Sequence, residues 1–153
     1  MTVADGRNAV VAPDGSDGGT RRHIGSLIRR AQQRHAALWV ESVSARVSSV
    51  QYAALETLAG APGASQRELG EELGLDRSTI ADLVRRMEAS GLLVRRRDDA
   101  DRRRNTLELT ARGAAEYEAL RPAVDAIQVR LVEGLGADEA ARLRGLLLRV
   151  IGE

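Results

Sequence analysis

The stretch QRELGEELGLDRSTIADLVR, residues 66–85, decides the fold of this chain. Two short helices that meet at a steep angle need apolar contacts from both, a small residue where their backbones approach, and a glycine at the turn. Gly70 is the small residue and Gly74 is the turn glycine. The pattern therefore predicts a helix-turn-helix. Its apolar contacts are Leu69, Leu73, Leu75, Ile80, Leu83, Val84 and Met87.

Both helices of this unit carry sequence signals at their ends. Ser65 and Glu68 form an S-x-x-E capping box, in which each side chain accepts a hydrogen bond from a backbone N–H at the helix start. Asp76 is an N-cap for the second helix, which we expect to continue to Gly91.

The second helix has a polar face opposite its apolar one, at about 100° per residue. A helix that enters the major groove of DNA has this arrangement, because its first turns meet base edges and its N-terminal end favours phosphates. An ordinary solvated face is the alternative, and Asp82 counts against contact with phosphates. The predicted DNA contacts on this helix are Arg77, Ser78, Thr79, Asp82, Arg85 and Arg86.

A predicted β-hairpin follows, with strands in LLVRR (92–96) and NTLELT (105–110). Its tip gathers arginine in a chain whose formal net charge is only +1. A hairpin after a helix-turn-helix is the wing of a winged helix, and a narrow minor groove favours an inserted arginine. We predict that arginines of the wing enter that groove and that Asp101 orients Arg103. The alternative is an exposed loop whose mixed charges only keep it solvated.

Two helices are predicted before the helix-turn-helix. The second of them covers residues 48–60, with Ser49 as its cap and Gly60 as its stop. Residues 1–20 are rich in glycine and aspartate, and we expect a disordered leader there. The first helix carries an apolar stripe at steps of three and four residues. That stripe is Ile24, Leu27, Ile28, Ala31, His35, Leu38 and Trp39.

Two more helices are predicted after the hairpin. Thr110 can cap the first, which should run to about Leu135 with a kink or break near Leu120 because of Pro122. The last runs from about residue 138 to 151. The terminal segments hold more apolar residues than a small lobe can cover, so we expect a partner surface. These residues are Ile24, Leu27, Ile28, Leu38, Ile127, Leu131, Leu146, Leu147, Val150 and Ile151.

Composition argues against several other classes of protein. All 23 basic residues are arginine, which a GC-rich genome explains and which also suits phosphate and guanine contacts. The chain has no cysteine, so it has no disulfide, thiolate metal site or thiol redox sensor. His23 and His35 have no acidic partner at ligand spacing, so we predict no metal site.

The sequence also lacks the patterns of a catalytic site. A P-loop, a nucleophile elbow and a paired-carboxylate pocket are all missing, so we predict no enzyme activity, no catalytic residue and no cofactor. No stretch approaches the roughly 20 apolar residues of a membrane span, and the start does not resemble a signal peptide. We therefore expect a soluble, cytoplasmic protein without a membrane partner.

Over about residues 22–151 the chain resembles the MarR family of bacterial transcription regulators. The stretches that carry the resemblance are SVQYAALETLAG (49–60), SQRELGEELGLDRSTIADLVRRMEASGLLVRR (65–96) and DDADRRRNTLELTARG (98–113). The wing pattern of the family, D-x-R followed by an apolar-x-L-T ending, falls on Asp101, Arg103, Leu107, Leu109 and Thr110. The resemblance implies that Arg103, with Arg102, enters the minor groove of DNA.

The resemblance implies a mainly α fold with a small β-hairpin wing, in which a winged helix-turn-helix lobe is joined to N- and C-terminal dimerisation helices. Residues 21–48 would be the N-terminal dimerisation helix, 49–110 the DNA-binding region and 111–153 the C-terminal dimerisation helices. The partners it implies are a second copy of the chain and a pseudo-palindromic double-stranded DNA operator. The two lobes would reach half-sites roughly 34 Å apart.

Members of the family often release DNA when a small aromatic acid or phenol binds. On physical grounds the candidate pocket residues are His35, Trp39 and Arg46, of which Arg46 could meet a carboxylate. The alternatives are an interface histidine, simple packing of the tryptophan and a solvated arginine. We therefore predict a ligand-responsive, homodimeric, DNA-binding repressor. The alternatives are a winged-helix interaction module that does not bind DNA and a small enzyme.

Overall fold

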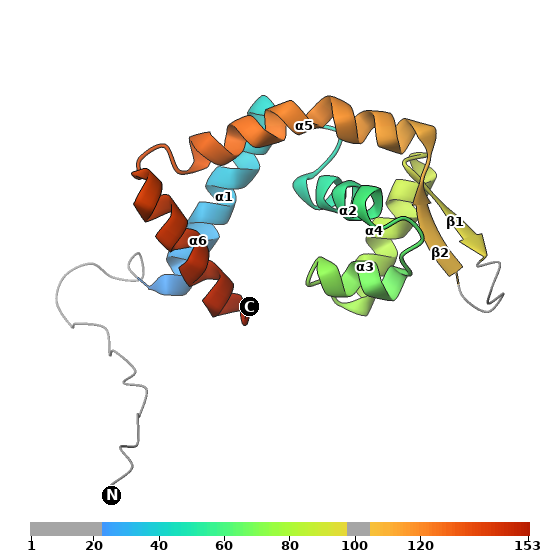
Figure 1. Cartoon of the computed structure of the whole chain (residues 1–153), viewed down its shortest axis with the longest axis horizontal. Coiled ribbons are helices and arrows are strands. Elements are labelled where there is room, and N and C mark those ends of the chain that lie inside the picture. The colour runs from blue at the N-terminus through green and yellow to red at the C-terminus, as the bar shows by residue number, and fades with distance from the viewer. Residues whose placement is uncertain (1–22, 98–104) are drawn as a thin grey trace, which may run out of the picture. The chain divides into compact units, whose positions relative to one another are not determined.

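The computed structural model describes residues 23–97 and 105–153, in which six helices and one antiparallel β-hairpin follow one another (Figure 1). The predicted fold class, mainly α with a small hairpin, is confirmed. The described residues divide into two units, with the boundary between residues 32 and 33. The elements are α1 (Ile24–Ser42), α2 (Ser49–Gly60), α3 (Gln66–Glu72), α4 (Arg77–Ala89), β1 (Leu93–Arg97), β2 (Asn105–Leu109), α5 (Ala111–Leu131) and α6 (Ala137–Ile151).

Helices α3 and α4 form the predicted helix-turn-helix. A Cβ atom on Gly70 would lie 3.2 Å from Cγ2 of Ile80, so only a glycine fits there without a shift of its neighbours. Gly74 has a φ of +61°, in the left-handed region that favours glycine. Both glycines therefore have the roles that the sequence predicted.

The helix caps are confirmed at three of four positions and are wrong at one. Ser65, Asp76 and Thr110 cap α3, α4 and α5 as predicted. The cap of α2 is Ser48 rather than Ser49, because Ser48 is followed three residues later by Gln51, which completes a capping box.

The hairpin pairs β1 with β2 in the register Leu93↔Leu109 to Arg97↔Asn105. Leu93 and Leu107 are buried, so the base of the hairpin packs on the core. The hairpin leads into α5 through Thr110, whose hydroxyl donates to the carbonyl of Gly91 over 2.6 Å and accepts from the N–H of Gly113 over 3.0 Å.

Gly113 fixes how α5 begins, and no pattern in the sequence predicted this role. A Cβ atom at this position would lie 1.9 Å from the carbonyl oxygen of Leu92, so no other residue fits without displacing the backbone. The first turn of α5 therefore lies directly against the turn that joins α4 to β1.

A break of α5 near Leu120, one of the two outcomes predicted from Pro122, is absent, and the predicted end of this helix is wrong. The helix runs unbroken through Pro122, because the missing proline N–H removes a single hydrogen bond from a helix of 21 residues. It ends at Leu131 rather than near Leu135, since the chain forms a turn over residues 132–134 around Gly134.

One hydrophobic core joins α2, α3, α4, the hairpin and α5 with Trp39 from the end of α1. Leu38 is 9% exposed and Ile127 is 1% exposed, so their predicted need for a partner surface is wrong. Ile127 lies in this core cluster, which shows that α5 covers apolar surface of its own subunit.

Helix α6 follows α5 (Figure 1) and buries none of its residues against the described part of the chain. Leu146 and Leu147 are 46% and 47% exposed, and Val150 and Ile151 are more exposed still. In the other unit, Ile24, Leu27 and Ile28 are also exposed. Among residues 23–97 and 105–153, no helix is both long and apolar enough to cross a membrane.

Candidate nucleic-acid interface

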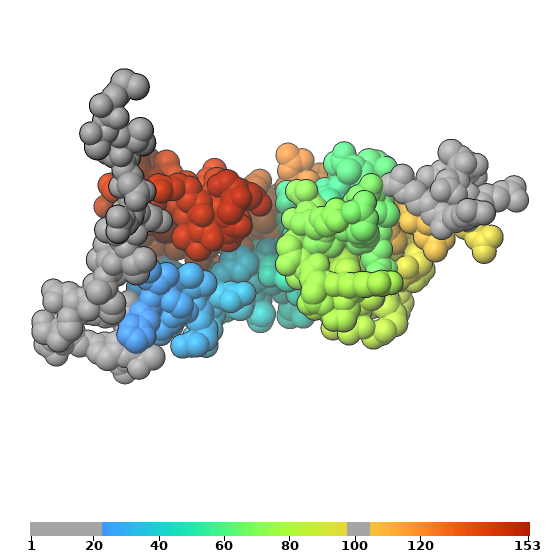
Figure 2. Space-filling view, turned by 90° about the horizontal axis from the view of Figure 1, so that it is seen from below, coloured from blue at the N-terminus to red at the C-terminus, as the bar shows by residue number. Residues whose placement is uncertain are grey.

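Helix α4 divides cleanly into a buried face and an exposed face. Ile80, Leu83, Val84 and Met87 are all buried in the core. Figure 2 shows the helix-turn-helix, coloured green to yellow-green, on the face turned toward the viewer. The structure exposes every α4 side chain that the sequence predicted to meet DNA, namely Arg77, Ser78, Thr79, Asp82, Arg85 and Arg86.

Asp76 organises the start of this exposed face. Its Oδ1 accepts from the backbone N–H of Ser78 at 2.9 Å and of Thr79 at 3.0 Å. The two hydroxyl groups also donate to it, from Ser78 Oγ to Oδ1 and from Thr79 Oγ1 to Oδ2, each over 2.6 Å. These hydrogen bonds, from Ser78 first and then Thr79, hold the pKa of Asp76 well below its ordinary value.

Asp82 lies one turn after Ser78 and forms an ion pair with Arg85, with 2.8 Å between Oδ1 and the guanidinium nitrogen. Both side chains are exposed. The pair offsets the charge of the carboxylate, which would otherwise repel a phosphate. Asp82 therefore counts less strongly against contact with phosphates than the sequence indicated.

Two ion pairs hold the stem of the hairpin. Arg95 on β1 contacts Glu88 of α4 at 3.2 Å, and Arg96 contacts Glu108 on β2 at 2.9 Å. No sequence pattern predicted a role for either glutamate. Glu108 could have been found from the register, because Arg96 pairs with Thr106 and Glu108 is its diagonal neighbour. The predicted wing residues Asp101, Arg102 and Arg103 lie outside the described residues.

The three residues predicted for an effector pocket have different surroundings. Trp39 is 4% exposed and its indole N–H donates to the carbonyl of Val47 at 2.7 Å, so it is packed in the core. His35 is half-buried, with its ring centroid 6.0 Å from that of Trp39. Arg46 is exposed in the loop after α1, not at the helix end itself.

The ring of Trp39 continues into a row of aromatic side chains. Its centroid lies 5.7 Å from that of Tyr52 on α2, which in turn lies 5.5 Å from that of Tyr117 on α5. Burial, followed by the charge of Glu56, raises the pKa of Tyr52 to about 12. The row therefore joins three helices through rings in an apolar setting.

Charged groups also join the second half of α1 to the end of α5 and the turn that follows it. Arg34 contacts Glu133 at 3.0 Å, and Arg130 contacts Glu41 at 3.2 Å. Arg130 also donates to the hydroxyl of Ser42. No local pattern in the sequence indicates these contacts, because the partners are separated by about 90 residues or more.

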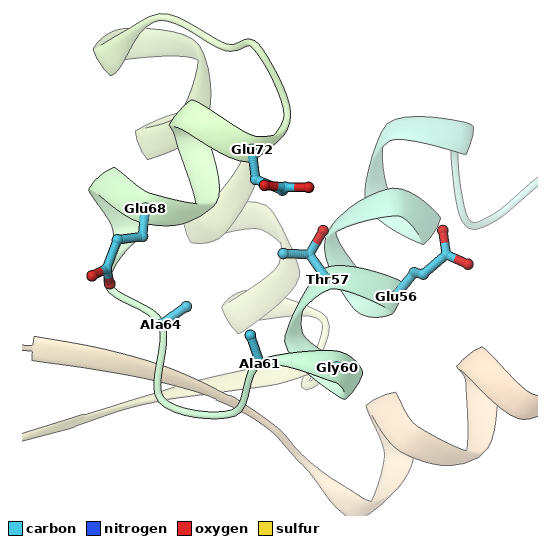
Figure 3. Close-up of a pocket in the computed structure, with 7 residues that line it drawn as sticks. All are labelled: Glu56, Thr57, Gly60, Ala61, Ala64, Glu68 and Glu72. Atoms are coloured by element: carbon cyan, nitrogen blue, oxygen red, sulfur yellow. The ribbon is translucent and has the colours of Figure 1, made fainter. Parts of the chain in front are cut away.

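A hollow of about 530 Å³ lies elsewhere, between α2 and α3. Figure 3 shows Thr57 of α2 and Glu72 of α3 pointing toward one another across it. Its lining is Glu56, Thr57, Gly60, Ala61, Ala64, Glu68 and Glu72. Three of these side chains are carboxylates, which disfavour an anionic ligand. Within the described parts of the chain, no group of acidic and histidine side chains could hold a metal ion.

Comparison with known proteins identifies the family. A family model described as "MarR family" matches residues 47–104. The chain is 33% identical over 129 residues to the HTH-type transcriptional repressor NicR of Pseudomonas putida, a match that covers 84% of this chain and 82% of the relative. This level of identity over most of both chains is a whole-protein relationship.

Solved structures agree. The PcaV transcriptional regulator of Streptomyces coelicolor, in complex with its natural ligand, is 40% identical with a TM-score of 0.83, over 89% of this chain and 96% of that one. BpsR of Bordetella bronchiseptica, whose DNA binding is regulated by 6-hydroxynicotinic acid, is 26% identical with a TM-score of 0.83, over 90% and 99% of the chains. The chain belongs to the MarR family of winged-helix transcriptional regulators.

Proposed function

We propose that this regulator is a homodimeric repressor that binds a pseudo-palindromic operator and releases it when a small aromatic acid binds. The observation that carries DNA binding is the division of α4, in which one face is buried in the core and the other presents exposed polar side chains. This is the arrangement that a helix in the major groove requires. The contacts we propose for it are Arg77, Ser78, Thr79, Asp82, Arg85 and Arg86.

The homodimer is supported by the apolar side chains that α6 exposes. Its leucines are roughly half exposed, and Val150 and Ile151 are exposed by 66% and 67%. Contiguous apolar surface of this kind marks a protein interface. We propose that residues 21–48 and 111–153 form the dimer and that residues 49–110 bind DNA, with residues 1–20 as a leader.

Operator binding can be tested on the intergenic DNA next to the gene. We expect nuclease protection of two half-sites whose centres are about one helical turn, or roughly 34 Å, apart. Binding should weaken with salt, because arginines displace counterions from the phosphates. Protection of no DNA segment, at a protein concentration where the dimer is folded, would refute a DNA-binding function and favour an interaction module.

The wing is tested by Arg103→Ala. We propose that Arg103, with Arg102 beside it and Asp101 orienting it, enters the minor groove. The variant should bind more weakly, and its slope of log affinity against log salt should fall by about 1. Arg149→Ala, an exposed arginine on α6, is the matched control and should leave the slope unchanged. Equal slopes for the two variants would contradict the proposal that the wing contacts DNA.

The effector class is supported by BpsR, whose DNA binding 6-hydroxynicotinic acid regulates. We propose that an aromatic acid binds near His35, Trp39 and Arg46, where one ring and two basic side chains are available. Trp39 contributes there as packing, since its N–H is already bonded to Val47. The hollow between α2 and α3 does not suit this ligand, because it is lined by three glutamates.

Trp39 is the only tryptophan, so its fluorescence reports on its surroundings directly. Titration with 6-hydroxynicotinic acid should change this fluorescence and release operator DNA over the same concentration range. His35→Ala should lower the affinity for this acid by about tenfold, because the variant loses one hydrogen bond to a charged group. His23→Ala, which changes the other histidine, is the control. Equal affinities for both variants would exclude His35 from the site.

A further inference from the structure

The hydroxyl groups of Ser78 and Thr79 have one proton each, and the structure shows where both protons go. Each hydroxyl donates to the carboxylate of Asp76 over 2.6 Å. The direction of these bonds is fixed because an ionised carboxylate only accepts hydrogen bonds. Asp76 is ionised at neutral pH, because these hydrogen bonds lower a pKa that is already acidic.

A hydroxyl whose proton is committed can still accept through its remaining lone pair. Ser78 and Thr79 can therefore offer DNA only acceptors. Asp82, one turn further along the same exposed face, is a carboxylate and also only accepts. Its ion pair with Arg85 engages one oxygen, and a carboxylate has about four lone-pair positions in all.

In the major groove, donors and acceptors differ between bases. The hydrogen-bond donors there are the amino groups, N4 of cytosine and N6 of adenine, whereas guanine and thymine present acceptors. A hydroxyl that is free to rotate can donate to an acceptor on a base or accept from a donor on a base. A hydroxyl whose proton is held by a carboxylate can only accept, so it pairs only with donors on the bases.

We propose that Asp76 is a specificity-determining positioning residue, which makes Ser78 and Thr79 acceptors so that the start of α4, with Asp82, selects amino-bearing bases. The inference rests on the proposed binding of DNA through α4. It concerns which bases are read there, not whether α4 binds an anion. Asp76 itself need not touch DNA.

Asp76→Asn separates this role from helix capping, because asparagine caps a helix about as well as aspartate. The two backbone N–H groups need an acceptor, so the amide oxygen takes the place of Oδ1. The amide NH₂ then takes the place of Oδ2 and donates to Thr79, which frees the Thr79 proton for DNA. The base preferred at that position should change from adenine or cytosine to guanine or thymine.

The experiment selects duplexes from a pool with randomised half-sites, using the full-length protein. Wild-type selection should enrich adenine or cytosine at the positions facing the start of α4. Replacing that cytosine by 2-pyrimidinone, or that adenine by purine, removes only the amino group and should weaken binding by about 5- to 100-fold. The Asp76→Asn pool should be enriched in guanine or thymine at one of these positions. The double variant Asp76→Asn with Thr79→Val should lose that new preference.

The outcomes are distinct. If the wild-type protein enriches no sequence, the proposed sequence-specific binding of an operator is refuted, and this inference with it. If it enriches a sequence whose affinity does not change when amino groups are removed, only this inference is overturned. An Asp76→Asn protein that keeps the thermal stability and the base preferences of the wild type would also overturn it. A shifted preference that survives Thr79→Val would overturn the assignment to Thr79.

Discussion

Helices α4 and α6 are amphipathic to a similar degree and have similar lengths, 13 and 15 residues, but only α4 buries its apolar face. Four of its residues lie in the core, whereas α6 buries none against the described part of the chain. The comparison teaches that an amphipathic pattern shows a helix needs a partner without showing whether the partner belongs to the same chain. The helix-turn-helix lobe covers the apolar face of α4, whereas no described residue buries a side chain of α6.

The largest effect on stability should come from adding a side chain at Gly113, where the start of α5 contacts the backbone of Leu92. Gly113→Ala would place a Cβ 1.9 Å from the Leu92 carbonyl oxygen, so the backbone must move. We expect a loss of about 4 kcal/mol or more in the free energy of unfolding, measured with urea. Gly60→Ala is the matched control, because the added Cβ would have no described atom within 4 Å apart from its chain neighbours and the backbone of its own helix. A similar stability for both variants would show that Gly113 and the Leu92 carbonyl are not in such close contact.

The next effect tests whether α6 packs on a second subunit. Leu146→Glu with Leu147→Glu should weaken self-association by more than about 100-fold, because each leucine is about half exposed in the subunit, so burying the rest contributes about half of the 1.5–3 kcal/mol of full burial, twice over in a symmetric dimer. Sedimentation equilibrium measures this change. Ala141→Glu, on the opposite side of α6, should leave the mass of the particle unchanged. If the double variant also remains a dimer, the interface lies elsewhere.

A smaller effect should appear in the lobe at alkaline pH. The pKa of Tyr52 is raised from 10.0 to about 12 in the folded state. The contribution of the protonated phenol to the free energy of unfolding is therefore fully present below pH 10 and is lost as the pH rises toward 12. The loss should reach at most about 2.7 kcal/mol. Urea unfolding between pH 9 and about 12 should therefore show a decline that is weaker in Tyr52→Phe. An identical decline in both proteins would assign it to other groups.

The smallest effect concerns the corrected cap of α2. Ser48→Ala removes the side chain that accepts from the Gln51 N–H at 3.2 Å and should cost about 1 kcal/mol. Ser49→Ala should cost only a few tenths, because this residue is the first of the helix and not its cap. Thermal unfolding of the two variants tests the assignment, and the reverse order of stability would restore Ser49 as the cap.

Features set by residues close in sequence were predicted well. The capping box of Ser65, the N-caps Asp76 and Thr110 and the glycines at 70 and 74 follow from local rules, and the structure confirms each of them. The hairpin was also predicted from two β-prone runs that flank a charged connection.

Features that depend on distant contacts were missed or were wrong. The burial of Leu38 and Ile127 within their own subunit could not be predicted from their helices, because an apolar stripe does not identify the segment that covers it. The contact of Gly113 with Leu92 depends on how α5 returns to the end of α4. In the candidate interface, the exposed side chains followed from helical periodicity, but the hydrogen bonds from their hydroxyls to Asp76 were not predicted.

The sequence by itself determined the winged helix-turn-helix, because its periodicity, caps and turn glycines act over a few residues and need no further contact. Only the tertiary structure decided which apolar faces are already covered, since burial depends on segments far apart in the chain. It also decided the hydrogen-bonding character of α4, because a hydroxyl can donate or accept until a neighbour fixes its proton. For Ser78 and Thr79 that neighbour is Asp76.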